Sequence, residues 1–134
     1  MNDQKNLLNS VHTKENSRAI AENQTQFAEE VLRIIPSSSQ ILELGCGVGN
    51  DSVLFAKSGH TVLATDFSEV IIEKNIALFK DLPHIQFKVV DMTEPMDISD
   101  NTVDVVYARL SLHYFTDEVT RNIINEIKRV LKSD

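Results

Sequence analysis

The sequence has a single cysteine among its 134 residues, no tryptophan and only three prolines. One cysteine cannot form an internal disulfide, so we expect a cytoplasmic protein. No apolar stretch approaches the roughly 20 residues that a helix needs to cross a membrane. The N-terminal residues, MNDQKNLLNSVHTKENSR, lack the apolar core of a signal peptide. This length and composition therefore predict one soluble domain without a membrane segment.

Basic residues are also scarce, since 13 Lys and Arg stand against 20 Asp and Glu and give a formal net charge of −7. An excess of negative charge disfavours binding to nucleic acids and to anionic membranes. The four histidines and the acidic residues show no spacing typical of metal ligands, so we expect no metal site. These absences turn attention to the apolar pattern of the chain.

Apolar residues alternate between strand-like runs and helical spacing. The expected strands are residues 40–44, 60–66, 85–91 and 102–108, and the expected helices are residues 25–35, 50–58, 69–80 and 117–132. The expected helical core positions are Phe27, Val31, Ile34 and Ile35, then Ile72, Ile76 and Phe79, and finally Val119, Ile123, Ile127 and Val130. Such alternation predicts a parallel sheet with helices on both faces.

Three glycines, Gly45, Gly47 and Gly49, occupy every second position directly after the first strand. Glycine adopts positive φ and has no Cβ, so a ligand can lie against the backbone. In an open parallel sheet, ligands bind beyond the carboxyl ends of the strands, where this loop is expected. One glycine would suffice for a tight turn without a ligand, so three of them favour a ligand-binding loop.

Asp66 ends the second expected strand. The two oxygens of a carboxylate match the two vicinal hydroxyls of a ribose, and an acidic residue at this position recurs in nucleotide-binding βαβ units. An Asp that follows a strand often caps the next helix, but Ser68 is the better cap here. We therefore expect the Asp66 side chain to be free for a ligand.

Four segments in this order, ELGCGVG, ATDFS, VVDM and VDVVYARLSLHYF, resemble the class I S-adenosylmethionine-dependent methyltransferases. A dinucleotide-binding GxGxxG motif would need glycine at position 50, where Asn50 stands. The resemblance implies a polar segment at residues 1–25 and a Rossmann-like α/β domain at 26–134. Its parallel sheet would have strand order 3-2-1-4, helices on both faces, and none of the last three strands that family members add.

The resemblance also implies S-adenosylmethionine as the cofactor and gives roles to residues of the first two motifs. Gly45 and Gly47 would lie against its methionine and ribose, and Glu43 would help to fix the loop and the methionyl end. Asp66 would bind the ribose hydroxyls, and Phe67 would lie against the adenine.

Residues after the third and fourth strands would complete the site. Asp91 would accept a hydrogen bond from the adenine amino group, and the Met92 amide would contact a ring nitrogen. The backbone at Ala108 and Arg109 would contact the methionine amino group. No catalytic residue can be assigned; His113 is a candidate base, and lining of the pocket is the alternative role.

The implied reaction is an SN2 methyl transfer to an acceptor that is expected to be a small molecule. Two alternatives stay open: a cofactor-binding module or inactive fragment without turnover, and a fragment of a nicotinamide-dependent oxidoreductase. No Asn/Asp-Pro-Pro-Tyr motif follows the fourth strand, which argues against the enzymes that methylate amino groups in DNA.

Cys46 is expected to pack beneath the loop. The open edge of the fourth strand predicts self-association.

Overall fold

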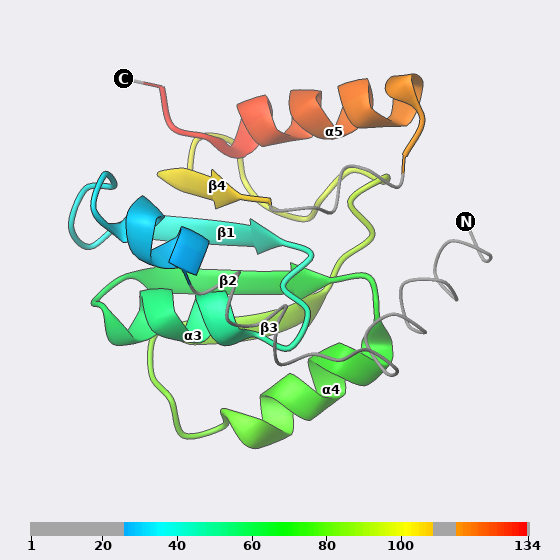
Figure 1. The fold of residues 1–134 in the computed structure, drawn as a ribbon. Coiled ribbons are helices and arrows are strands. Elements are labelled where there is room, and N and C mark those ends of the chain that lie inside the picture. The colour runs from blue at the N-terminus through cyan, green and yellow to red at the C-terminus, as the bar shows by residue number, and fades with distance from the viewer. Residues whose placement is uncertain (1–25, 109–114, 134) are drawn as a thin grey trace.

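The computed structural model describes residues 26–108 and 115–133 of the chain (Figure 1). Residues 26–32 are helical. The later elements are β1 (Gln40–Leu44), α3 (Asn50–Lys57), β2 (Thr61–Asp66), α4 (Glu69–Leu78), β3 (Ile85–Val89), β4 (Val105–Tyr107) and α5 (Asp117–Val130). The four strands pair in parallel in the order β3-β2-β1-β4, which confirms the predicted strand order.

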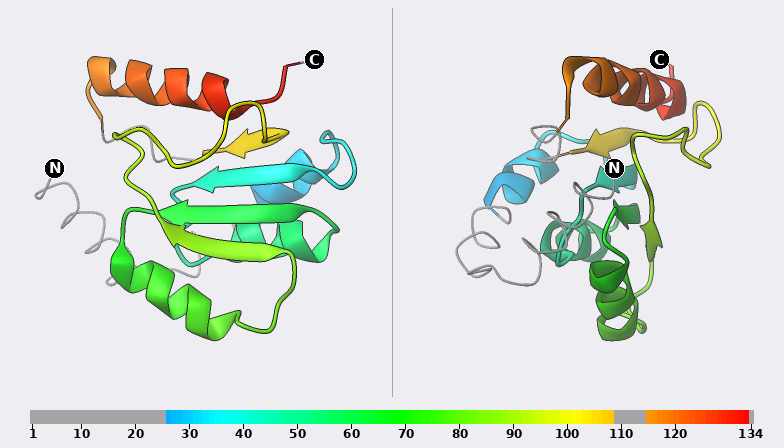
Figure 2. Two further views of the ribbon diagram at one scale, coloured as in Figure 1. Left: turned by 180° about the vertical axis from the view of Figure 1, so that it is seen from behind. Right: turned by 90° about the vertical axis from the view of Figure 1, so that its right-hand side faces the viewer.

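Successive side chains of each strand point to opposite faces of the sheet and enter two separate cores. Ile41, Val62 and Phe87 belong to the first core, which is completed by residues 26–35, α3 and α4. Leu42 and Leu44 belong to the second core, with α5 and the connection between β3 and β4. Figure 2 shows α3 and the helix at residues 26–32 on the same side of the sheet. Helices therefore cover both faces, as predicted.

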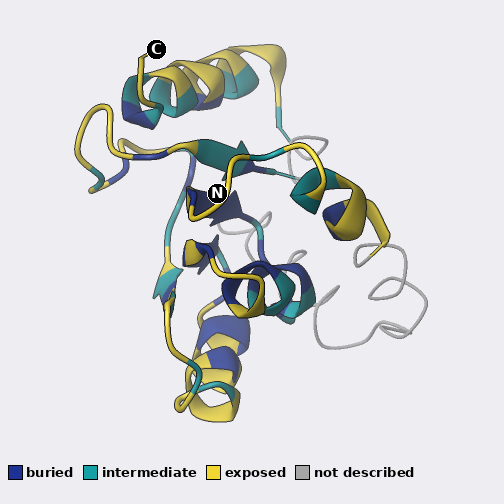
Figure 3. Ribbon diagram, turned by 90° about the vertical axis from the view of Figure 1, so that its left-hand side faces the viewer, coloured by how far each residue is buried: buried dark blue, intermediate teal, exposed yellow. Residues whose placement is uncertain are grey.

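Helix α5 is amphipathic and is capped as its sequence predicts. Ile123 and Val130 are fully buried in the second core, with Val119 and Ile127 packed against it. The Thr116 hydroxyl accepts a hydrogen bond from the Val119 amide, and acidic residues in the first turn and basic ones in the last complement the helix dipole. The outward side of this helix is exposed, as Figure 3 shows.

Three expected core positions, Phe27, Ile34 and Ile76, are exposed. Ile76 is 50% exposed because α4 faces the sheet through Ile71, Ile72 and Asn75 instead. Ile34 is 81% exposed because the first helical segment ends at residue 32, before the helical spacing reaches it. Phe27 is 43% exposed, although its ring contacts Tyr107. Helical spacing identifies an apolar face, but it determines neither where the helix ends nor which residues of that face pack on the sheet.

The outer edge of β4 is less open than the sequence predicts. This strand spans Val105–Tyr107 rather than residues 102–108, and Val103 instead forms an isolated parallel bridge with Leu131. The Lys132 amide donates to the Val103 carbonyl at 2.9 Å, so the chain leaving α5 pairs with the beginning of this edge. Only the part of the edge at Val105–Tyr107 has no strand beside it among the described residues.

Arg129 of α5 holds the connection between β3 and β4. Its guanidinium donates to the carbonyls of Met96 and Ile98 at 3.0 and 2.7 Å. Glu126, one turn earlier, accepts from the Met96 amide at 2.7 Å and pairs with Arg129. These bonds attach a segment without regular secondary structure to the helix that covers the second core.

We expect Phe55→Ala to lower the free energy of unfolding by about 3–5 kcal/mol, because it leaves a cavity in the first core. Phe55 is fully buried, and its ring makes an edge-on contact with Tyr107 at 5.0 Å between centroids. Urea denaturation followed by circular dichroism measures the change. Leu78→Ala, at a side chain that is 72% exposed, is the control and should change stability little. Equal effects of the two substitutions would contradict the assignment of the core.

Candidate functional site

The glycine loop, residues 45–49, connects the carboxyl end of β1 to α3. Its three glycines have φ of 75°, 55° and 86°, a region that side chains disfavour. A Cβ at Gly49 would lie 3.3 Å from Phe87 Cε1 and 3.6 Å from Asn75 Cγ. The third glycine is therefore needed for packing of the loop on the core, whereas Gly45 and Gly47 are the ones expected to face a ligand.

Gly47 is held on both sides by side chains from the next βα unit. Its amide donates to Asp66 Oδ2 at 2.9 Å, and its carbonyl accepts from Asn75 Nδ2 at 2.8 Å. A further backbone bond, from the Cys46 amide to the Thr65 carbonyl at 2.8 Å, extends the pairing of β1 with β2 into the loop. The loop conformation thus depends on β2 and α4.

Asp66 is not free, contrary to the prediction. The residue is 2% exposed, and its second oxygen accepts from the Ser68 amide at 2.9 Å. Ser68 caps α4 as expected, since its hydroxyl accepts from the Ile71 amide. The Asp66 carboxylate therefore braces the glycine loop and also the start of α4.

Glu43 lies buried beneath the loop, where it is 4% exposed, and it accepts a hydrogen bond from the Ser52 hydroxyl of α3. Burial raises the pKa of Glu43 well above its usual value. The Ser52 hydrogen bond opposes this shift, and the nearby charges of Asp51 and Asp66 add to it. The carboxyl group therefore retains its proton to a higher pH than an exposed glutamate does.

Asp51 connects the start of α3 to β4. The Tyr107 hydroxyl donates to Asp51 Oδ2 at 2.6 Å. The Tyr107 ring also contacts Phe55 and Phe27, the latter at 5.7 Å between ring centroids. Phe27, in the helix that precedes β1, is thereby brought next to Tyr107 at the end of β4.

Asp91 and Met92 follow β3 at the same edge of the sheet, and the Val90 amide donates to the Asp66 carbonyl at 3.0 Å. The Asp91 side chain is half-buried and accepts from the Thr93 amide at 2.9 Å. The Met92 side chain is buried in the second core, so only its backbone is available to a ligand. Phe67, directly after Asp66, is half-buried.

Arg109 and His113 lie outside the described residues, and Ala108 is the last described residue before them. Cys46 is 3% exposed within the first core, and burial raises the pKa of its thiol. A buried thiol of this kind is not a nucleophile, which agrees with the packing role expected for Cys46.

The sequence interpretation missed four residues that shape this site: Asp51, Ser52, Asn75 and Tyr107. The signal for Asn75 was present, because a polar residue occupied a position that helical spacing from Ile72 assigns to the core. The signal for Ser52 was absent, since nothing in the sequence relates it to Glu43.

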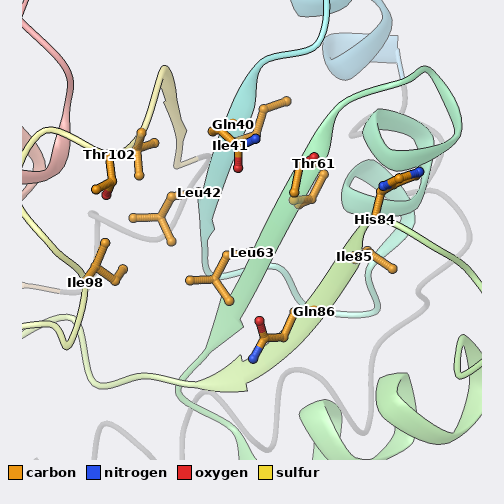
Figure 4. A pocket seen from close by; sticks show the side chains of 12 residues that line it. Gln40, Ile41, Leu42, Thr61, Leu63, His84, Ile85, Gln86, Ile98 and Thr102 are labelled. Carbon is orange, nitrogen blue, oxygen red and sulfur yellow. The ribbon is translucent and has the colours of Figure 1, made fainter.

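A cavity of about 440 Å³ opens at the other end of the strands, beside residues that begin them, such as Gln40 and Thr61 (Figure 4). Its floor includes Leu42, Leu63 and Gln86. The cavity contains no residue of the glycine loop, so it is separate from the candidate site.

Within residues 26–108 and 115–133, no group of three or more His, Cys, Asp or Glu side chains is arranged to hold a metal ion. In the same ranges, no helix is both long enough and apolar enough to span a bilayer. The polar groups described around the glycine loop are carboxylates, amides and hydroxyls, which can form hydrogen bonds with an organic ligand.

The model of a methyltransferase domain family matches residues 41–134 of the chain. Phosphoethanolamine N-methyltransferase 1 of Triticum aestivum is 38% identical over 107 residues, which are 77% of this chain and 22% of that protein. The chain spans about a fifth of the length of this relative and of a second from the same plant.

Solved structures share the fold. Phosphoethanolamine N-methyltransferase 1 of Haemonchus contortus, in complex with phosphoethanolamine and S-adenosylhomocysteine, superposes with a TM-score of 0.81 at 23% identity over 99% of this chain and 30% of that one. A putative S-adenosylmethionine-dependent methyltransferase of Methanococcus maripaludis superposes with a TM-score of 0.73 at 27% identity over 98% and 59%. The predicted Rossmann-like fold is thus confirmed.

We expect Glu43→Gln to change how stability depends on pH. Because folding raises the pKa of Glu43, the folded state binds the proton of this carboxyl group more tightly than the unfolded state does. The resulting contribution to stability is complete only below the pKa of Glu43 in the unfolded state, near 4.5. It is lost as the pH rises through the folded pKa, so the variant should gain stability relative to the original protein over that range.

Urea denaturation across a pH series above 4.5 measures this difference in the free energy of unfolding. The matched control is Glu73→Gln, at an exposed position of α4, and it should leave the pH dependence unchanged. If the free energy of unfolding changed with pH in the same way in the Glu43→Gln variant and in the original protein, Glu43 would not hold its proton in the folded state.

Proposed function

Because the chain belongs to this methyltransferase domain family, we propose that it binds S-adenosylmethionine at the glycine loop and transfers the methyl group to a small-molecule acceptor. The observation that carries this proposal is the loop itself, with Gly45 and Gly47 at positive φ beyond β1 and with Asp66 against it. Glycines leave the backbone accessible at the edge of a parallel sheet where nucleotide-like ligands bind.

The residues of the chain would bind and orient the cofactor, which supplies the activated methyl group. Gly45, Gly47 and Glu43 would form the methionine side of the site. Asp66 would bind the ribose, because a carboxylate oxygen accepts more than one hydrogen bond and so can bind a hydroxyl while bracing the loop. We place the cofactor-binding domain at residues 26–134, after the polar segment 1–25.

The adenine side of the site would be formed by residues after β2 and β3. Phe67 would lie against the ring, while Asp91 and the Met92 amide would bind its polar edge. Arg109, after β4, would approach the methionine amino group through its backbone. Support for the roles of Phe67, Asp91 and Met92 is their position directly after β2 and β3, at the carboxyl ends of two neighbouring parallel strands.

The buried carboxyl groups favour S-adenosylmethionine over a nicotinamide dinucleotide. A dinucleotide brings a doubly negative pyrophosphate to the start of the first helix, where backbone amides bind it. Here Asp51 occupies the first turn of α3, and the Asp66 carboxylate binds the Gly47 amide. S-adenosylmethionine carries no phosphate and has a positively charged sulfonium, so it suits this environment better.

The acceptor is proposed from the relatives, whose names include phosphoethanolamine N-methyltransferase. Phosphoethanolamine is therefore the first acceptor to test, by mass detection of the methylated product. A negative net charge argues against a nucleic-acid acceptor. A cytoplasmic location is also proposed, since Cys46 is a free, buried thiol.

The alternative function is a module that binds the cofactor without turnover. Calorimetric titration with S-adenosylmethionine followed by a methyl-transfer assay on a panel of small amines separates the two. Binding with transfer supports the enzyme, and binding without transfer supports the module.

Asp66→Ala should weaken S-adenosylmethionine binding, because it removes a charged acceptor worth roughly 1.5–3 kcal/mol per hydrogen bond. It should also lower stability, since the amides of Gly47 and Ser68 lose their acceptor. Calorimetry at a temperature where circular dichroism shows a folded variant measures the affinity. Asp81→Ala, at an exposed position, is the control. Native affinity in a folded Asp66→Ala protein would contradict the assignment of Asp66 as a residue that binds the ribose.

Gly47→Val should abolish cofactor binding, because a branched side chain is strained at φ 55° and would project from the loop. Gly59→Val is the control: its φ is 96°, but no atom lies within 4 Å of its Cβ position. This control should lose stability and retain affinity. If Gly47→Val bound the cofactor as tightly as the original chain, the loop would not be the binding site.

We also propose that the chain self-associates through the edge of β4. Among the described residues, β4 is an edge strand with no strand on its outer side at Val105–Tyr107, and such an edge is a template for another strand. Val105→Lys should reduce association in sedimentation velocity runs over a concentration series. Ile124→Lys, on the exposed side of α5, should not. A chain that sediments as a monomer at every concentration would contradict this proposal.

A further inference from the structure

Two successive peptide planes of the glycine loop are each bound by a side chain from outside the loop, and the carbonyl of the second also accepts a weak hydrogen bond from Cys46 Sγ at 3.7 Å. Asp66 binds the amide of the Cys46–Gly47 peptide, and Asn75 donates to the carbonyl of the Gly47–Val48 peptide at 2.8 Å. Glycine adopts many backbone conformations, so the planes on either side of Gly47 have little intrinsic preference. Their orientation is therefore set from outside the loop.

Asn75 is built into the apolar face of α4. It is 3% exposed and lies one turn after Ile72, which is buried in the first core, and one turn before Phe79, which packs against that core. A polar amide in such surroundings costs free energy unless it is hydrogen-bonded. The bond to Gly47 satisfies one donor, and the 3.6 Å between Asn75 Cγ and a Cβ at Gly49 shows how closely the loop passes it.

The bond also determines the direction of the next amide. A trans peptide is planar, so a Gly47 carbonyl that points to Asn75 turns the Val48 amide away from α4. Without Asn75, the Gly47–Val48 plane could rotate and exchange the places of a carbonyl and an amide. A loop that must receive a ligand against its backbone would then present different polar groups to it.

We propose that Asn75 is a positioning residue, which holds the Gly47–Val48 peptide in the orientation that receives the cofactor without touching the cofactor itself. This inference rests on the proposed function, because it specifies how the same glycine loop is prepared for S-adenosylmethionine. It assigns to α4 a part in cofactor affinity that is separate from its packing.

The test is a calorimetric titration with S-adenosylhomocysteine of the original protein, Asn75→Leu and Asn75→Ala. Leucine has nearly the shape of asparagine and suits an apolar core, so Asn75→Leu should lower the melting temperature less than Asn75→Ala, which also leaves a cavity. It should bind S-adenosylhomocysteine about tenfold more weakly, because the Gly47 carbonyl loses its amide donor. Asn75→Ala should show a similar loss of affinity with a lower melting temperature.

The matched control is Asn125→Leu, the same chemical change at an exposed position of α5, and it should alter neither quantity. If Asn75→Leu bound S-adenosylhomocysteine with native affinity, the role of Asn75 would be purely structural. The same conclusion would follow if both variants had a lower melting temperature and unchanged affinity. Either result would overturn this inference and leave the proposed function intact. Failure of the original protein to bind S-adenosylhomocysteine would instead overturn the proposed function, and the inference with it.

Discussion

The hydrogen bond between the Gly47 amide and the Asp66 carboxylate joins the loop after β1 to the end of β2, and the candidate site depends on it. Parallel pairing places both residues at the same edge of the sheet, and burial of the carboxylate makes the bond costly to break. Through its second oxygen, Asp66 also sets where α4 begins. One side chain therefore relates the loop, β2 and α4 in space.

The strand order and the caps of α4 and α5 could be predicted from the sequence because local patterns determine them. Ser68 and Thr116 precede apolar helical spacing, and each caps its helix. The hydrogen bond that engages the Asp66 carboxylate could not be predicted, because its partner Gly47 is brought near only by the pairing of β1 with β2. The exposure of Ile76 was missed for a similar reason, since helical spacing alone does not determine the angle at which a helix packs.

The site combines a glycine-rich backbone with acidic groups that have little access to water. Glu43 can stay neutral, because burial raises its pKa, while its neighbours Asp51 and Asp66 are engaged by hydrogen bonds. Such an arrangement limits mutual repulsion among three carboxyl groups beneath one loop. It also leaves a site whose polarity is set by the protein before a ligand arrives, which reduces the reorganisation that binding requires.

The glycine loop and both of its side-chain supports lie within residues 40–75, a contiguous part of the chain that contains β1, α3, β2 and most of α4. Contacts that are close in sequence have a small entropic cost of loop closure and tend to form early. During folding, this unit can shape the loop before β4 and α5 dock on the outer side of β1. The hydrogen bonds of Asp66 and Asn75 to Gly47 both come from within this unit, so a change in β4 or α5 removes neither of them.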